Sequence, residues 1–491
     1  MDNDFILVLD LGGPEAVATA RKLRNQGIYT EIMAGSPDIG TFVRKSPRGL
    51  LIVGGEDGDM ERFPKDALSL GIPVLAMGGA ARMLARAVGA QTEGILLANT
   101  ASQITFLPCD LFDGLSESDR YFTRIDGFTL PEGFQPIATT SDALTPAFAD
   151  FDRKLYALQF YAESNDPDGA AILSNFAEKI CGCTQKWSIE NYLEEEIRYI
   201  REKVGERGVL MAVSGGVDST TCAVLMRRAM GDHLTCVFVD NGLLRAGEAE
   251  AVQSFFQREL DITPIRVDAK NRFMARLKGI TDSEEKHRAL HNEFLNVLGE
   301  VFEAHPECAF VAQGTIYSDL LSSTTVDEAY ARRIDRNLLI EPLRMLFKDE
   351  VRELAQVLGL PQELINRQPF PGPALAVRCA GEVTEEKLTM LRRADAIFRE
   401  EIESNGQDRR LSRYFAVLTD TLTLGRPGGA PYGYACALRA VSEQGVAGFT
   451  AGKLPYDLLD RIARRITGEI PGINRVTYDI TDSSSAEIEW E

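Results

Sequence analysis

The stretch from Gly208 to Cys222 constrains the fold of this chain more than any other part of its sequence. It begins with a short apolar run, Val209 to Val213, and continues through Ser214-Gly-Gly-Val-Asp-Ser219 into residues with helix-like apolar spacing. A short apolar run that is closed by turn residues is typical of a strand buried on both faces of a parallel sheet. The stretch therefore predicts a strand, a glycine turn and a helix, with the turn at the carboxyl end of the strand.

The residues of this turn are suited to binding an anion. Gly215 and Gly216 let the backbone approach a ligand without a Cβ, and Ser214 and Ser219 add hydroxyl donors. The helix that follows directs the positive end of its dipole to the same place. We therefore expect a phosphate site here.

The turn differs from a Walker A loop, because it lacks the Gly-x-x-x-x-Gly-Lys-[Ser/Thr] pattern and no lysine follows its glycines. Chemistry other than γ-phosphoryl transfer is therefore indicated. Asp218 would repel a polyphosphate unless a cation lay between them. We expect Mg²⁺ to bridge Asp218 and the phosphates.

Composition limits the classes of protein to be considered. A chain of 491 residues with 44% hydrophobic residues is expected to form two to four domains. Its net charge of −20 and the absence of a basic run argue against a nucleic-acid-binding protein. The start of the sequence lacks a signal-peptide pattern and no apolar run approaches ~18 residues, so we expect a cytoplasmic protein without membrane spans. The eight cysteines are scattered, which favours buried thiols over a disulfide framework or a zinc site.

Alternating strands and helices predict an α/β protein with two doubly wound parallel-sheet domains and a small α+β domain. In the first domain, apolar runs end at Gly54-Gly55 and at Gly78-Gly79, but no Cys, Ser or His follows Met77 where a nucleophile would be presented. In the last domain, exposed strands favour pairing with a second copy, so we expect a homodimer. The predicted domains are 1–185, 186–378 and 379–491.

Seven groups of residues together form a specific pattern: Ser214-Gly-Gly-Val-Asp-Ser219, Val237-Phe-Val-Asp-Asn-Gly-Leu-Leu-Arg245, Ala312-Gln-Gly-Thr-Ile-Tyr317, Glu341-Pro-Leu343 with Phe347-Lys-Asp-Glu-Val-Arg352, Pro369-Phe-Pro-Gly-Pro373, Leu391-Arg-Arg-Ala-Asp-Ala-Ile-Phe398 and Ile488-Glu-Trp-Glu491. In these residues the chain resembles the GMP synthetases along essentially its full length. The family joins a class I glutamine amidotransferase domain to an ATP pyrophosphatase domain and a dimerisation domain. The resemblance implies adenylylation of xanthosine 5′-monophosphate (XMP), release of pyrophosphate, and displacement of AMP by ammonia to give GMP.

The resemblance also implies ATP and Mg²⁺ as cofactors and assigns roles to particular residues. Asp218 and Lys348 are expected to be catalytic, and Asp218 to bind the metal. The acceptor-binding residues are expected to be Arg378, Arg332, Arg333 and Glu489. The residues expected to bind ATP and pyrophosphate are Ser214, Gly215, Gly216, Val217, Asp218, Ser219, Asp240, Asn241 and Gly314.

The sequence departs from the family pattern at its glutaminase residues. Gly78 stands where the family has its nucleophilic cysteine, Tyr161 stands where it has histidine, and only Glu163 of the three is retained. A thioester mechanism needs both a thiolate and its base. We therefore predict that this chain does not hydrolyse glutamine and takes ammonia, free or delivered by a separate glutaminase.

The acceptor side departs as well. The segment Ser322 to Ile340 is shorter than the family's lid, and Arg332-Arg333 are its only adjacent basic residues. In the tail, Ser483 replaces a lysine and Glu487 replaces a threonine. Three hypotheses remain open: amination of XMP or a related purine nucleotide, the same activation chemistry on another acceptor, and a non-catalytic nucleotide-binding paralogue.

Overall fold

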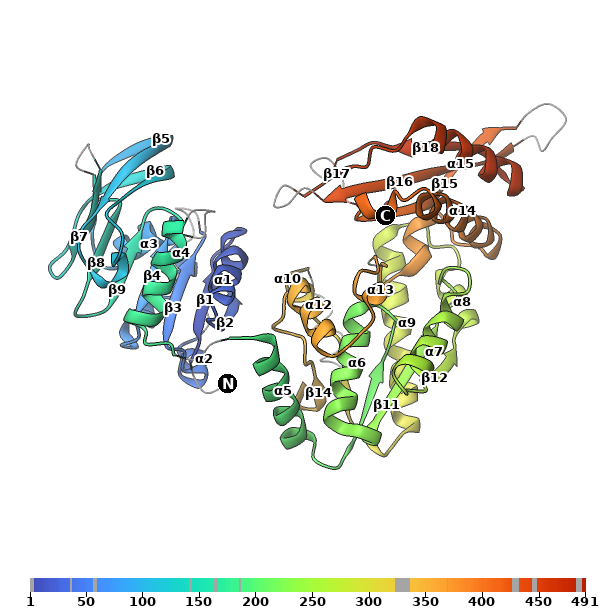
Figure 1. Ribbon diagram of the computed structural model, residues 1–491, viewed down its shortest axis with the longest axis horizontal. Coiled ribbons are helices and arrows are strands. Elements are labelled where there is room, and N and C mark those ends of the chain that lie inside the picture. The colour runs from blue at the N-terminus through green and yellow to red at the C-terminus, as the bar shows by residue number, and fades with distance from the viewer. Residues whose placement is uncertain are drawn as a thin grey trace. The chain divides into compact units, whose positions relative to one another are not determined.

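The computed structural model describes residues 4–35, 38–55, 60–140, 144–162, 167–184, 187–322, 336–368, 370–425, 432–443, 448–482 and 488–491. The chain divides into two compact units, Met1–Tyr192 and Leu193–Glu491 (Figure 1). Among the helices described, none combines the length and the apolar character that a membrane span needs.

The first unit is built on a nine-stranded mixed sheet in the order β2-β1-β3-β4-β9-β8-β7-β5-β6. Neighbouring strands from β2 to β9 in this order are parallel, and those from β9 to β6 are antiparallel. The strands are β1 (Ile6–Asp10), β2 (Thr30–Ala34), β3 (Gly49–Val53), β4 (Val74–Met77), β5 (Gln91–Phe106), β6 (Glu117–Thr129), β7 (Gln135–Thr140), β8 (Ala147–Asp150) and β9 (Leu155–Leu158).

The helices of this unit follow strands, as in a doubly wound fold. They are α1 (Glu15–Asn25), α2 (Ile39–Lys45), α3 (Gly79–Ala87) and α4 (Pro167–Asn175). The strands β3 and β4 are buried at every position, which agrees with their continuous apolar sequences. The predicted α/β fold is confirmed, and the structure adds an antiparallel half to this sheet.

The second unit contains a five-stranded parallel sheet in the order β12-β11-β10-β13-β14. Its strands are β10 (Gly208–Ala212), β11 (Leu234–Asp240), β12 (Ile265–Asp268), β13 (Cys308–Ala312) and β14 (Leu339–Ile340). The chain runs from β10 outward to β12 and then returns to β13 on the other side of β10. The order of the strands therefore reverses between β10 and β13, and ligands of open α/β sheets bind at such a point.

Helices accompany this sheet throughout. Ser188 caps the first of them, because its hydroxyl accepts a hydrogen bond of 3.2 Å from the Asn191 N–H. The helices are α5 (Ile189–Val204), α6 (Val217–Met230), α7 (Glu248–Glu259), α8 (Lys270–Leu277), α9 (Ser283–Ala304), α10 (Tyr317–Ser322), α12 (Lys348–Val357) and α13 (Gln362–Ile365).

The remainder of the second unit is a small, mainly antiparallel sheet with two helices. The strands β15 (Arg413–Leu424), β16 (Tyr432–Glu443) and β17 (Phe449–Ala451) pair in an antiparallel manner, and β18 (Ile473–Asp479) adds to β16 in parallel. The helices are α14 (Glu385–Ser404) and α15 (Tyr456–Glu469), and a 3₁₀ turn, η7 (Ala374–Arg378), precedes them.

One hydrophobic core extends through both sheets of this unit. It includes Val237 of the parallel sheet, Leu375 of η7 and Phe398 of α14. The η7 turn is held from both sides, because the Leu375 N–H donates to the Leu243 carbonyl and the Ala380 N–H to the Leu418 carbonyl. This packing determines the position of Arg378, the last residue of η7.

Candidate active site

The turn between β10 and α6 forms a network of its own hydroxyl groups. The Oγ atoms of Ser214 and Ser219 lie 2.9 Å apart, and the Ser219 Oγ also accepts from the Ser214 N–H at 3.2 Å. The Gly216 N–H donates to the Ser214 Oγ at 3.3 Å. These bonds orient both hydroxyls at the start of α6, where the first N–H groups of the helix also point. The arrangement can hold an anionic group such as pyrophosphate.

Close packing explains the glycines of this corner. Gly215 has a φ of +78°, and a Cβ built on it would lie 2.3 Å from a methyl group of Val252 in α7. A Cβ on Gly314, which follows β13, would lie 3.1 Å from the Ser219 Cα. The structure therefore brings the predicted Gly314 against the turn Ser214 to Ser219, at the place where the strand order reverses.

Asp218 and Lys348 form an ion pair at this corner. The Lys348 Nζ lies 2.7 and 2.5 Å from the two carboxylate oxygens of Asp218. Lys348 is the first residue of α12, whose first turn is fixed by a 2.8 Å bond from the Phe347 N–H to the Glu350 carboxylate. About 30% of each side chain of the pair is exposed, at 31% for Lys348 and 29% for Asp218. Both side chains are therefore accessible to a ligand that binds from solvent.

Asp319 adds a carboxyl group next to this pair. Burial raises the pKa of Asp319, and the negative charge of Asp218 raises the pKa further, although a hydrogen bond from the Ile316 N–H and the charge of Lys348 oppose the rise. Among the described residues, no group of three or more His, Cys, Asp or Glu side chains is arranged to hold a metal ion. The corner therefore offers the partly exposed carboxylate of Asp218, with the Asp319 carboxyl group beside it. Such a site suits Mg²⁺, which takes most of its ligands from phosphate and water.

Arg367 also contacts the turn Ser214 to Ser219 and was not predicted. Its guanidinium donates to the Gly215 carbonyl at 3.0 Å and to the Glu248 carboxylate at 2.5 Å. Arg367 thereby ties the turn to the first residue of α7. No motif spacing identified this residue, although it lies two residues before the segment Pro369 to Pro373.

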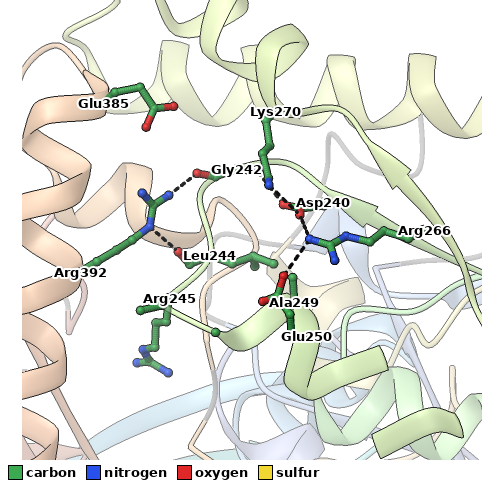
Figure 2. Close-up of a pocket in the computed structure, with 12 residues that line it drawn as sticks. Asp240, Gly242, Leu244, Arg245, Ala249, Glu250, Arg266, Lys270, Glu385 and Arg392 are labelled. Carbon is green, nitrogen blue, oxygen red and sulfur yellow. Dashed lines mark hydrogen bonds and ion pairs between the residues drawn. The ribbon is translucent and has the colours of Figure 1, made fainter. Parts of the chain in front are cut away.

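A cavity of about 300 Å³ lies beyond the carboxyl end of β11 (Figure 2). Asp240 is its buried centre, with 2% of its surface exposed. The Asp240 carboxylate accepts from the Gly242 N–H at 3.1 Å and from Arg266 at 2.6 Å, and Lys270 lies 3.4 Å away. Burial acts to raise the pKa of Asp240, but these donors outweigh it and hold the pKa below its usual value. The residues that line the cavity are Asp240, Gly242, Leu244, Arg245, Ala246, Gly247, Ala249, Glu250, Arg266, Lys270, Glu385 and Arg392.

The loop that forms this cavity is held from within and from α14. The Asn241 side chain accepts from the Leu243 N–H at 2.9 Å, so it stabilises the turn. Arg392 of α14 donates to the carbonyl groups of Gly242 and Leu244, as Figure 2 shows. The predicted pair Asp240 and Asn241 therefore shapes the loop, and their place beside a nucleotide stays a prediction.

Arg378 and Glu489 lie together, as their shared role predicted. The Nε and Nη2 atoms of Arg378 each donate to one carboxylate oxygen of Glu489 at 2.9 Å. The Arg378 guanidinium lies 3.9 Å from the centre of the Phe415 ring, and 1% of its side chain is exposed. Its Nη1 atom is buried and has no hydrogen-bond partner in the part of the chain that the structure describes. A buried donor of this kind can bind an oxygen of a ligand.

Arg245 lies near this pair and was not singled out from the sequence. Arg245 and Arg378 both approach the Phe370 ring, at 4.5 and 5.3 Å from its centre. Arg245 also forms an ion pair of 2.9 Å with Asp395. Its position in the segment Val237 to Arg245 was the only available signal. The predicted Arg332 and Arg333, and the substituted Ser483 and Glu487, lie outside the described residues.

In the first unit, Gly78 and Tyr161 are in contact. Gly78 joins β4 to α3 with a φ of +63°, and its N–H donates to the Leu158 carbonyl at 2.8 Å. A Cβ at position 78 would lie 2.2 Å from the Tyr161 Cζ and 2.4 Å from its hydroxyl oxygen. The tyrosine ring thus occupies the space into which a nucleophilic side chain would project. Glu163 lies outside the described residues.

The strand order of the second unit, with a glycine turn and a helix start at the reversal of that order, is that of an open α/β protein whose ligand site is expected at this corner. Residues 400–490 match the family model of the GMP synthase C terminal domain. Proteins named "GMP synthase [glutamine-hydrolyzing]" are similar along the whole chain. Those of Acetivibrio thermocellus and Clostridium acetobutylicum are 40% identical over 515 residues and 39% identical over 511, and that of Geobacillus kaustophilus is 40% identical over 513. Each comparison covers 100% of both chains. This chain belongs to the GMP synthase family of carbon–nitrogen ligases, which use ATP.

Proposed function

We propose that this protein aminates XMP in an ATP-dependent reaction that uses ammonia, and that it does not hydrolyse glutamine itself. The observation that carries the proposal is the corner between β10 and α6, where Ser214, Ser219 and the Asp218–Lys348 pair meet at the reversal of strand order. The full-length similarity to the three GMP synthases supports the choice of substrate.

In the first step, the C2 oxygen of XMP attacks the α-phosphorus of ATP, and the bond from that phosphorus to the bridging oxygen of pyrophosphate breaks. The hydroxyls of Ser214 and Ser219 and the N–H groups of the first turn of α6 stabilise the departing charge. Asp218 would ligate Mg²⁺ together with phosphate oxygens, and the ion would offset the repulsion between carboxylate and phosphates. Lys348 supplies a further positive charge to the same oxygens.

In the second step, ammonia attacks C2 of the adenylylated base, and the C2–O bond breaks to release AMP. The nitrogen loses its surplus protons to water or to a neighbouring base, which leaves the amino group of GMP. Arg378 supports acceptor binding because its buried Nη1 still has a hydrogen bond to donate. We assign Glu489 to the acceptor site together with Arg378. We also assign Arg332 and Arg333 to this site, where they would bind the phosphate of XMP.

The contact between Gly78 and Tyr161 supports the use of ammonia. Glycine has no side-chain nucleophile, and the tyrosine ring lies where a cysteine side chain would project. Ammonia would then come from solution or from a separate glutaminase. The exposed Leu422, Leu424 and Tyr432 of β15 and β16 support the homodimer that we propose.

The proposal is tested by measuring pyrophosphate and GMP formation from MgATP and XMP, first with ammonium and then with ammonium-free glutamine. We expect equal amounts of pyrophosphate and GMP with ammonium, and no GMP with glutamine. The nucleoside xanthosine and purine nucleotides other than XMP are tested as acceptors for comparison. Pyrophosphate release with another acceptor and none with XMP would overturn the substrate, and GMP formation from glutamine alone would overturn the choice of ammonia.

A further inference from the structure

The segment Ile488 to Glu491 is held by three basic side chains that are almost completely buried. Arg439 of β16 donates its Nε to the Ile488 carbonyl at 3.0 Å. Arg378 of η7 binds the Glu489 carboxylate, and Lys286 of α9 binds the Glu491 carboxylate. The exposed fractions of the three basic side chains are 2%, 1% and 0%. Elements that are far apart in the sequence therefore fix these four residues.

Lys286 is the least expected member of this set, because an ammonium group on the first turns of a helix normally lies in water. Its Nζ donates to the Cys379 carbonyl at 2.9 Å and to the Glu491 carboxylate. A buried charge is costly unless it is paired and hydrogen-bonded. Glu491 provides the pairing charge and keeps 16% of its own side chain exposed.

The two partners of Lys286 are close in the sequence to the two members of the Arg378–Glu489 pair. Cys379 directly follows Arg378 in the chain, and Glu491 lies two residues beyond Glu489. One ammonium group thus connects the backbone that carries Arg378 to the segment that carries Glu489. Without this connection, the geometry of the pair would depend on the pair itself, on Arg439 and on Arg413, whose guanidinium lies 3.9 Å from the Glu489 carboxylate.

We propose that Lys286 and Glu491 are positioning residues of the acceptor site, which hold Glu489 against Arg378 and so determine the affinity for the acceptor nucleotide. This inference rests on the proposed function of Arg378 and Glu489. Lys286 and Glu491 do not contact the phosphate-binding turn in the described structure, so their effect is confined to the acceptor and does not extend to ATP.

The test uses the full-length protein with Lys286→Met and, separately, Glu491→Gln. We expect the KM for XMP to rise about tenfold or more, while the KM for ATP and kcat at saturating XMP stay within about threefold, because the loss concerns binding of one substrate. The double variant Lys286→Gln with Glu491→Gln replaces the ion pair by two amides that can still form a hydrogen bond. We expect it to recover part of the XMP affinity.

Lys387→Met is the matched control. The Lys387 Nζ donates to the Ala380 carbonyl at 3.2 Å and to the Asp420 carboxylate at 2.7 Å. It therefore has the same types of partner as Lys286, a backbone carbonyl and a carboxylate, but neither partner belongs to the segment Ile488 to Glu491. We expect this variant to leave the KM for XMP within about twofold of the parent value. An equal rise in the control would overturn the inference, since it would trace the effect to general destabilisation.

Trp490 gives a readout that does not depend on activity. The chain has two tryptophans, and Trp490 has 40% of its surface exposed. In a Trp187→Phe background, release of the segment Ile488 to Glu491 in Lys286→Met or Glu491→Gln should shift the fluorescence emission of Trp490 to longer wavelength. Unchanged emission in both variants would overturn the inference, as would an emission shift without a change in the KM for XMP. A parent protein that does not aminate XMP would instead overturn the proposed function, so the two failures are distinguishable.

Discussion

Two corners of this molecule share a backbone plan and differ in their side chains. In the first unit, β4 leads through Gly78 into α3, and in the second unit β10 leads through Gly215 and Gly216 into α6. Both corners follow a buried strand of parallel neighbours, and both use a glycine with positive φ, +63° at Gly78 and +78° at Gly215. The first corner presents glycine to a tyrosine ring, and the second presents hydroxyls, a carboxylate and an ammonium group.

The comparison shows that the backbone of such a corner does not depend on its chemistry. Burial of the strand and close packing of the turn maintain the fold whether or not the turn carries reactive groups. The chemistry depends on the few side chains at the turn. The predictions below separate these two contributions.

The largest expected effect is that of Asp218→Ala on pyrophosphate release. We expect a fall of about 10²–10³-fold, because the variant loses the carboxylate that we propose to ligate Mg²⁺ beside the phosphates of ATP. The thermal midpoint should change little, since the side chain is partly exposed and leaves no core cavity. Asp232→Ala is a suitable control, because Asp232 lies just beyond the other end of α6 and pairs with Arg227 at 2.7 Å. Unchanged release in Asp218→Ala would contradict the assignment of this corner.

Gly215→Ala should affect both stability and activity. The added methyl group would meet Val252, which is 2% exposed, and alanine would be strained at a φ of +78°. We expect the free energy of unfolding to fall by about 2–4 kcal/mol. Pyrophosphate release should fall as well, because the turn that holds the leaving group is displaced. Denaturant unfolding measures the loss of stability, and the pyrophosphate assay measures the loss of activity. A variant with parental values in both would contradict the close packing of Gly215 against Val252.

The same substitution at the other corner should affect stability alone. Gly78→Ala would bring a methyl group against Tyr161, whose ring end can move aside more easily than Val252, so we expect a loss of about 1–2 kcal/mol. In a Tyr161→Ala background the penalty should shrink to the cost of the positive φ. A double-mutant cycle of unfolding free energies measures this coupling. A zero coupling energy, or a loss of ammonium-dependent activity in Gly78→Ala, would contradict the account of this corner.

The smallest effect concerns the dependence of stability on pH at Asp240. Arg266, Gly242 and Lys270 lower the pKa of this carboxyl in the folded state, so its contribution to stability is complete above its ordinary range and is lost as the pH falls through the lowered pKa. Asp240→Asn should therefore flatten the decline of stability below about pH 4. The difference should stay below about 1 kcal/mol, because Arg266 and Lys270 are partly exposed to solvent. Parallel acid unfolding curves for parent and variant would show that Asp240 carries no such linkage.

The sequence predicted the parallel strands and the strand–turn–helix geometry around Ser214 to Ser219 well, because both have local signals. The binding of phosphate by this turn stays a prediction. The apolar run Val209 to Val213 ends in a glycine turn, and β10 occupies Gly208–Ala212. The antiparallel half of the first sheet was missed. Its long strands are of mixed character, as in β5, where the apolar run Ile95 to Ala98 makes up only a small part of the strand, and their pairing depends on partners elsewhere in the chain.

The site residues divide in the same way. Ser214, Asp218 and Ser219 are close in the sequence, so their motif could be recognised. The contact of Lys348 with Asp218 spans 130 residues, and that of Arg367 with Gly215 spans 152. Contacts of this kind depend on the packing of α12 and of the segment after α13 against α6, which no local pattern encodes. Resemblance supplied Lys348, whereas Arg367 and Lys286 emerged only from the structure.

The central claim is that one corner has kept its chemistry while the other has lost it. The most direct test supplies XMP and MgATP together with ammonium and glutamine whose amide nitrogen is labelled with nitrogen-15. Mass spectrometry of the GMP then shows the origin of its 2-amino nitrogen. We predict GMP that carries only unlabelled nitrogen from ammonium. Labelled GMP formed by the purified protein would show that the first unit hydrolyses glutamine and would contradict the account.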